Sequence, residues 1–166
     1  DSKIMKKLFY FMLVAVLPLL AISLTSCSND DDLPQVVLSL DVLEDGNVVV
    51  SKGTVYAVAG APIILNDVLV KNQKPGEATI NMATFLWDAK TYARKQNRPF
   101  NIEFEKDLVT KGSHIIGLDC QVLAEGYPLS WGYANFPVVV VESQEDLPVP
   151  ENGTLEAVVQ LTENAQ

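Results

Sequence analysis

Residues 114–123 have the sequence HIIGLDCQVL, and this stretch is the clearest indicator of the fold. Every second side chain in it is apolar: Ile116, Leu118, Cys120 and Val122. Asp119 and Gln121 stand between them, and successive side chains of a strand point to opposite faces of the sheet. The stretch therefore predicts a strand with one face in a core and the other near water, and it places Cys120 in the core.

Segments of this kind recur along the chain after Pro34. Short runs rich in Val, Ile, Leu and Thr are separated by Gly, Asn, Asp and Pro about every ten residues, which is typical of all-β sandwiches and barrels. We expect strands at 36–43, 48–50, 54–58, 63–70, 79–88, 100–105, 114–123, 131–141 and 155–161. Asp45-Gly46 predicts a hairpin turn, and residues 74–77 predict another turn. The sequence thus predicts an all-β domain.

Three segments leave alternatives open. Ala83–Asn97 places Phe85 and Trp87 on one face of a strand, but it also has apolar residues at helical spacing, so it is either strand and turn or partly helical. Pro137–Val141 is apolar on both faces, as in a covered central strand or in a strand that pairs with another subunit. Leu155–Leu161 alternates, and it either returns to the sheet or is an edge strand donated to a partner.

Three pieces of sequence carry a family resemblance: ATFLWDAK at 83–90, RPFNIEF at 98–104 and LVTKGSHII at 108–116. With them, the chain from about Lys74 to Glu142 resembles the bacterial Ig-like domains common in Bacteroidetes surface proteins. Ala89 stands where that family has a turn glycine. The resemblance implies an Ig-like or fibronectin-III-like β-sandwich over 35–144, with 145–166 as a C-terminal strand or tail. Such sandwiches host many unrelated functions.

The N-terminus has the layout of a secretory signal. Lys6 and Lys7 precede an apolar run, Leu8–Leu24, and small polar residues follow it. The run is near the lower limit for spanning a bilayer and contains Pro18, which disfavours a permanent membrane helix. We therefore expect a helical signal peptide over 1–26, with Met5 as the initiator methionine.

The four residues 24–27, LTSC, resemble the lipobox of bacterial lipoproteins. This resemblance implies cleavage before Cys27 and attachment of lipid to its thiol, which would hold the protein in a membrane. The residues that follow resemble an export signal to the outer face of the outer membrane of Bacteroidetes: Ser28, Asn29, Asp30, Asp31 and Asp32. The alternative is a solvated linker within a 27–34 tether, on a protein that faces the periplasm.

Charge and residue types exclude several functions. From Cys27 to Gln166 the chain has nine Lys/Arg against twenty Asp/Glu, a net charge of −11, which does not suit nucleic acid. His114 is the single histidine, and a strand would hold it about 20 Å from Cys120, too far for a catalytic dyad. Asp41, Glu44 and Asp45 lack a calcium-loop pattern. We therefore predict no catalytic residues, no metal and no cofactor.

The predicted ligand-binding residues are aromatic: Tyr127, Trp131 and Tyr133. Exposed aromatic side chains suit stacking on sugar rings or anchoring a protein partner, whereas the alternative is that these side chains pack across the sandwich or cover its end. A basic group also stands out on the acidic chain: Lys90, Arg94, Lys95 and Arg98. It is either a site for an acidic glycan or lipid headgroup, or a solvated turn near carboxylates.

Together these features predict a cell-surface lipoprotein with a non-catalytic binding or adhesion module, with a glycan or a protein as ligand. The alternative is a structural envelope lipoprotein that faces the periplasm or self-associates through its strand edges.

Overall fold

The computed structural model describes residues 33–151 and 154–164. Within these ranges the chain forms strands, loops and one 3-10 turn at Gln144–Asp146, with no α-helix. The strands are β1 (Gln35–Val42), β2 (Val48–Ser51), β3 (Thr54–Val58), β4 (Ile63–Asn72), β5 (Ala78–Trp87), β6 (Lys90–Lys95), β7 (Ile102–Phe104), β8 (Gly112–Ala124), β9 (Ser130–Val141) and β10 (Leu155–Gln160). The all-β prediction is confirmed. The helical signal peptide expected at 1–26 and tether residues 27–32 lie outside the described residues.

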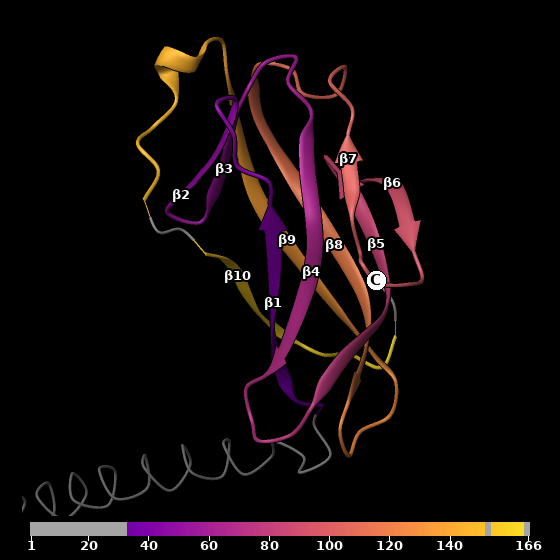
Figure 1. The fold of residues 1–166 in the computed structure, drawn as a ribbon. Helices are drawn as coiled ribbons and strands as arrows, with labels where there is room; N and C mark the ends of the chain where they lie inside the picture. Colours follow the sequence, from indigo (N-terminus) through magenta and orange to yellow (C-terminus); the bar gives the residue numbers. More distant parts are fainter. Residues whose placement is uncertain (1–32, 152–153, 165–166) are drawn as a thin grey trace, which may run out of the picture. The chain divides into compact units, whose positions relative to one another are not determined.

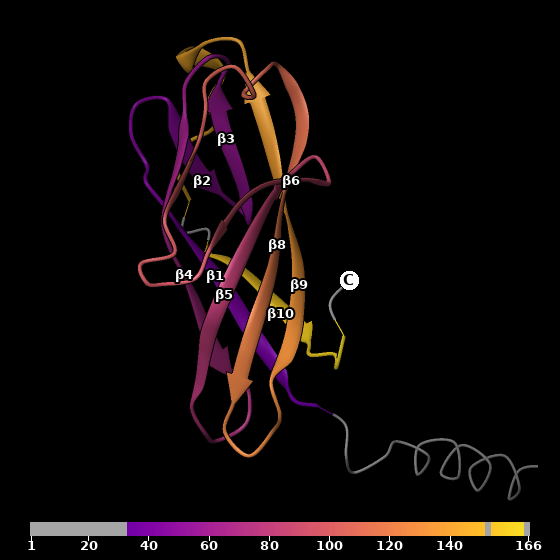
Figure 2. The same cartoon turned by 90° about the vertical axis from the view of Figure 1, so that its right-hand side faces the viewer.

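Two sheets face each other across one core (Figure 1). One has four strands in the order β10-β1-β4-β7, and the other has six in the order β2-β3-β9-β8-β5-β6. Figure 2 shows the same layers after a quarter turn. The chain changes sheet after β1, β3, β4, β6, β7 and β9, and the Ig-like or fibronectin-III-like β-sandwich prediction is confirmed. The hairpin turn predicted at Asp45-Gly46 is wrong, because the strands on either side of it, β1 and β2, lie in different sheets.

The core lies between the inner faces of the two sheets. Cys120 is fully buried there with the other alternate residues of β8, as its sequence predicts. Phe85 comes from the adjacent strand β5, and Phe104 comes from β7 in the other sheet; both are fully buried. Removing apolar surface from water contributes about 25 cal/mol per Å², so these large side chains supply much of the drive for the two sheets to pack.

The segment left open at Ala83–Asn97 is a strand, a tight turn and a second strand. β5 and β6 pair with only Asp88 and Ala89 between them, and both residues have positive φ, 48° and 66°. This is the backbone of a two-residue hairpin turn whose twist matches the flanking strands. A bulge follows, since Phe85 pairs with Ala93 and Leu86 with Thr91. The partly helical alternative is therefore wrong.

The bulge in β6 has a structural consequence at the side of the sandwich. It leaves Tyr92 without a partner residue in β5, and the Tyr92 ring packs on Phe104 with centroids 5.1 Å apart. The Tyr92 hydroxyl donates a hydrogen bond to the Glu103 carbonyl at 2.9 Å. Tyr92 thereby joins the edge strand β6 of one sheet to the edge strand β7 of the other.

The other two open segments also have definite positions. β9 lies between β3 and β8, so residues 137–141 are in an interior strand of the sheet. Its inner residues Val138 and Val140 are buried, but Val139 and Val141 are only half-buried, so the strand is fully covered on one face. β10 pairs with β1 of the same chain, and Leu155 and Val159 are buried in the core.

Replacing Ala89 by glycine should stabilise the fold. An L-residue in the left-handed region costs about 1–2 kcal/mol, and part of the gain from glycine is offset by its greater freedom in the unfolded chain. We expect Ala89→Gly to raise the free energy of unfolding by about 0.5–1 kcal/mol, measured by urea denaturation. Ala59→Gly, in a turn where φ is not positive, is the matched control and should give no gain. A loss of stability in Ala89→Gly would contradict the turn geometry.

Candidate functional site

Trp131 and Tyr133 lie on the outer face of the six-stranded sheet. Their neighbours Gly132, Ala134 and Phe136 are buried in the core, so alternation along β9 turns the two aromatic side chains outward. Both are half-buried, which leaves part of each ring in contact with solvent. These rings are thus not part of the packing between the two sheets.

Tyr127 is separate from this pair. It lies in the loop between β8 and β9, where it is half-buried and packs against the core. The structure therefore brings together two of the three predicted ligand-binding residues and places the third at the end of the sandwich. Period-two alternation assigns Trp131 and Tyr133 to one face, but it gives no information about a loop residue.

The Tyr133 ring is positioned by a glycine on the adjacent strand. A Cβ atom at Gly117 would lie 3.4 Å from the Tyr133 hydroxyl and 3.0 Å from Cβ of Leu86. The missing side chain lets the Tyr133 ring lean over β8, and its hydroxyl donates a hydrogen bond to Oδ1 of Asn135 at 3.0 Å. The ring is therefore held along the surface of the sheet instead of extending away from it.

Asp119 lies directly beside this aromatic pair. It pairs with Tyr133 of β9 on one side and with Thr84 of β5 on the other. Partial burial raises the pKa of its carboxyl group, and the charge of Arg94 offsets only part of that rise. Its Oδ1 atom is buried and has no hydrogen-bond partner among the described residues. The sequence indicated only that Asp119 faces away from the core.

Polar contacts also fix Gln121 and Trp131, which lie next to Asp119 and Tyr133 on the same face. Asn81 donates from Nδ2 to Oε1 of Gln121 at 3.1 Å, and Gln121 pairs with Trp131. The backbone of Trp131 exchanges two hydrogen bonds with Thr162, at 2.8 and 2.9 Å. The segment after β10 therefore holds the strand that carries Trp131.

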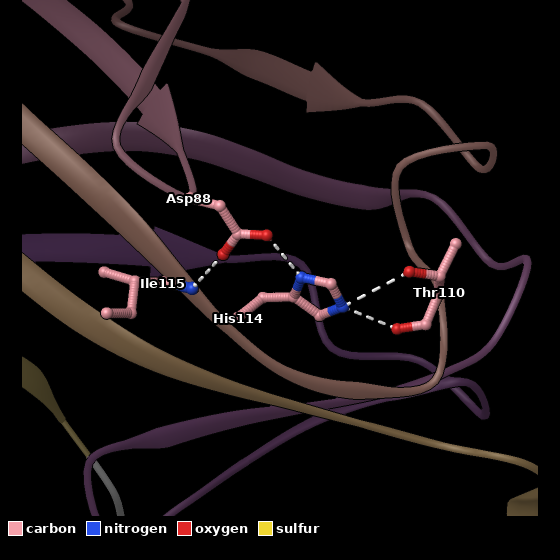
Figure 3. Close-up of polar contacts among 4 residues, drawn as sticks. All are labelled: Asp88, Thr110, His114 and Ile115. Atoms are coloured by element: carbon pink, nitrogen blue, oxygen red, sulfur yellow. Dashed lines mark hydrogen bonds and ion pairs between the residues drawn. The ribbon is translucent and has the colours of Figure 1, made fainter.

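His114 forms a second polar cluster at the other end of β8 (Figure 3). Its Nδ1 lies 2.6 Å from Oδ2 of Asp88, and its Nε2 lies 2.6 Å from the Thr110 carbonyl oxygen. A carboxylate and a carbonyl are both acceptors, so the protonated imidazole, which can donate from both ring nitrogens, is the form that satisfies both contacts. Asp88 also accepts from the Ile115 N–H at 2.9 Å, which joins the β5–β6 turn to β8.

Partial burial lowers the pKa of His114, but its hydrogen bonds to Asp88 and Thr110 and the charge of Asp88 together raise that pKa above its ordinary value. The ring also stacks on Trp87, with centroids 5.0 Å apart. Because each ring nitrogen lies within hydrogen-bond distance of an oxygen acceptor of the same chain, His114 has a structural role at the start of β8.

A pocket of about 460 Å³ lies beside this cluster. Its walls include Trp87, Tyr92 and Leu108, and Lys90 and Asp107 line it as well. The polar groups of Asp88 and His114 that border the pocket are already hydrogen-bonded to each other and to the backbone. The chemistry of the pocket is therefore mainly that of an apolar wall.

The basic group predicted from sequence does not act as one surface. Arg98 pairs with Asp67 of β4, whereas Arg94 donates from Nε to the Thr84 hydroxyl at 3.2 Å. Burial raises the pKa of the Asp67 carboxyl group. Hydrogen bonds from the Phe100 and Val68 N–H groups and from Arg98 lower that pKa by more than burial raises it, so the net shift is downward. Asp67 thus fixes the loop between β6 and β7 against β4.

Cys120, Glu44 and Asp45 make structural contacts in the folded chain. Burial raises the pKa of the Cys120 thiol, which lies in the core and is not a reactive group. The carboxylate of Glu44 accepts a hydrogen bond from the Val50 N–H of β2, and that of Asp45 accepts from the Asn47 and Val48 N–H groups. Across residues 33–151 and 154–164, no group of three or more His, Cys, Asp or Glu could hold a metal ion. No helix in these ranges is long and apolar enough to cross a membrane.

No model of a known protein family matches the sequence, and no curated protein matches it. Among solved structures, the chain is similar to the one titled "Structures of Clostridium thermocellum CbhA fibronectin(III)-like modules". The identity is 15%, the match covers 58% of this chain and 97% of that chain, and the TM-score is 0.39. The sandwich class rests on the strands and sheet order of this chain itself.

The His114 cluster predicts a specific pH dependence of stability. Because its pKa is higher in the folded chain than the ordinary value of 6.5, the stabilisation is complete below that pH and is lost as pH rises through the folded pKa. Thermal unfolding of the wild type and His114→Gln, from about pH 5 to about pH 9, should show a difference that shrinks with rising pH. A difference that stays constant over this range would show that His114 is not protonated in the folded state.

Proposed function

We propose that the chain is a lipid-anchored, non-catalytic binding module on the cell surface, and that its ligand is a glycan. The fold supports the part about a non-catalytic module, because the described residues form a β-sandwich in which no charged side chain is buried in the core. The anchor at Cys27 and the export residues 28–32 lie outside the described residues. Their sequence, which resembles a lipobox followed by an export signal, supports that part of the proposal.

The observation that carries the glycan proposal is the outward position of Trp131 and Tyr133 on an interior strand. Partly exposed aromatic rings with polar ends suit the apolar faces and hydroxyl edges of sugar rings. β9 is paired with β8 along its length, so the two rings stand on a rigid support and little freedom is lost when a ligand binds. Asp119, Gln121 and Asn135 supply polar groups next to the rings.

Replacing Trp131 tests the glycan proposal. Stacking of an aromatic ring is worth about 0.5–1.5 kcal/mol beyond its buried area, so Trp131→Ala should weaken polysaccharide retention by about tenfold or more in affinity electrophoresis. Tyr56→Ala is the matched control, because Tyr56 is also half-buried and pairs with Val139, about 26 Å along β9 from Trp131. This control should keep full retention. Absence of retention by the wild type would contradict the proposal.

The anchor and location have their own test. Intact cells that express the full chain should lose the domain to added protease, and Cys27→Ala should release the protein from the membrane fraction. Immunoblots of shaved and lysed cells measure both results. A domain that resists protease until the cells are lysed would instead support the envelope protein facing the periplasm.

A further inference from the structure

We propose that the outer face of the six-stranded sheet binds a neutral glycan chain and that Asp119 accepts hydrogen bonds from its hydroxyl groups. This inference rests on the proposed glycan-binding function. It adds the chemical class of the ligand and a residue that determines specificity.

Asp119 has one carboxylate oxygen without a hydrogen-bond partner among the described residues. Oδ1 is buried, yet no hydrogen bond reaches it from any described residue. A buried polar atom without a partner destabilises the folded state, and more so when it is charged, so such atoms are rare in folded proteins. Asp119 also stands in the middle of a sheet face, where a neutral residue would avoid this cost. The other carboxylate oxygen, Oδ2, is not among the buried atoms, so a ligand with hydroxyl donors can reach the carboxylate at Oδ2 and offset part of this cost.

Asp119 lies directly across from one of the two aromatic rings of β9. Asp119 pairs with Tyr133, and Gln121 pairs with Trp131, so each ring has a hydrogen-bonding side chain directly across on β8. Cross-strand pairs of this kind place Cβ atoms about 4.5–5.5 Å apart. A sugar ring stacked on Tyr133 would therefore bring its hydroxyl edge within reach of Asp119.

The outer face of the six-stranded sheet is also long enough for several sugar units. Along β8 the outward positions run from Gly117 through Asp119 and Gln121 to Leu123, a distance of about 20 Å. A hollow of about 370 Å³ lined by Glu77, Thr79, Leu123 and Glu125 continues the face at its far end. Such a surface suits a chain of sugars better than a single ring.

Charge selects among glycans. Asp119 and the carboxylates of Glu77 and Glu125 lie along this face, and Arg94 is the nearby cation that acts on Asp119. The guanidinium of Arg94 already donates to Thr84. Carboxylates and a chain of negative net charge repel uronic acids and sulfated sugars, so the surface favours a neutral glycan.

The test is affinity electrophoresis of residues 33–166, which form one compact unit with a complete core. The gels contain neutral polysaccharides (amylopectin, mannan, xylan or galactan) or acidic ones (polygalacturonate or alginate). We expect retardation by at least one neutral polysaccharide and by neither acidic one. Asp119→Asn should raise the Kd for that polysaccharide at least about tenfold, because the amide replaces one of the two acceptor oxygens by a donor and removes the charge that strengthens the hydrogen bond.

Asp41→Asn is the matched control, since Asp41 is exposed on β1 in the other sheet. It removes the same charge and should leave retardation unchanged. Thermal unfolding of Asp119→Asn checks that the variant is folded, and we expect no loss of stability because the burial that raises the pKa of Asp119 also disfavours its charge.

The outcomes separate this inference from the proposed function. Retardation of the wild type by an acidic polysaccharide, or equal retardation of Asp119→Asn and Asp41→Asn, would overturn the neutral ligand or the role of Asp119 and leave glycan binding standing. No retardation of the wild type by any of the six polysaccharides would overturn both. Retardation by a neutral polysaccharide that is lost in Asp119→Asn alone would support both.

Discussion

Side-chain alternation along the paired strands β8 and β9 is the constraint on which the rest of the structure depends. The two strands pair in one unbroken antiparallel register from Gly112 opposite Val140 to Val122 opposite Ser130. A shift of one residue would turn Cys120 to the solvent and Asp119 into the core, so the apolar face fixes the register strongly. The same register sets which side chains meet on the outer face. Core and proposed binding surface are thus two sides of one strand pair.

Much of this arrangement could be predicted from sequence because it follows from a period of two residues. Alternation alone assigned Cys120 to the core and gave Trp131 and Tyr133 a common face. What it could not supply was which strands are neighbours, so it could not place Asp119 beside Tyr133 or Arg94 beside Thr84. These contacts join residues far apart in the chain, and their pairing depends on the order of strands in the sheet.

Local backbone geometry was the other limit on prediction. The hairpin at Asp88 and Ala89 requires positive φ at both residues, and Ala89 does not signal this as glycine would. Of the apolar residues at helical spacing in this segment, Tyr92 packs on Phe104 beside a bulge in β6, and Ala89 is an exposed residue of the turn. The turn is held by contacts that the sequence does not show, since the Asp88 carboxylate binds His114 and the Ile115 N–H.

The two ends of β8 therefore differ in character. At the His114 end, charged groups satisfy one another and fix a turn, whereas at Asp119 a buried carboxylate oxygen is left without a partner. Native proteins retain such unfavourable groups chiefly where function requires them, often at a cost in stability. This contrast is why we assign ligand binding to the Asp119 end and a structural role to the His114 end, although the larger pocket lies beside His114.

The most direct test of this account is an NMR titration of isotope-labelled residues 33–166 with oligosaccharides from the polysaccharide that the wild type retains. The two tryptophans give two indole N–H signals, one from the buried Trp87 and one from the partly exposed Trp131. We predict that the Trp131 signal and the amides of Asp119 and Tyr133 shift with ligand, while those of Trp87 and His114 do not. Shifts confined to Trp87, Tyr92 and His114 would contradict the account and place the binding site in the pocket at the other end of β8.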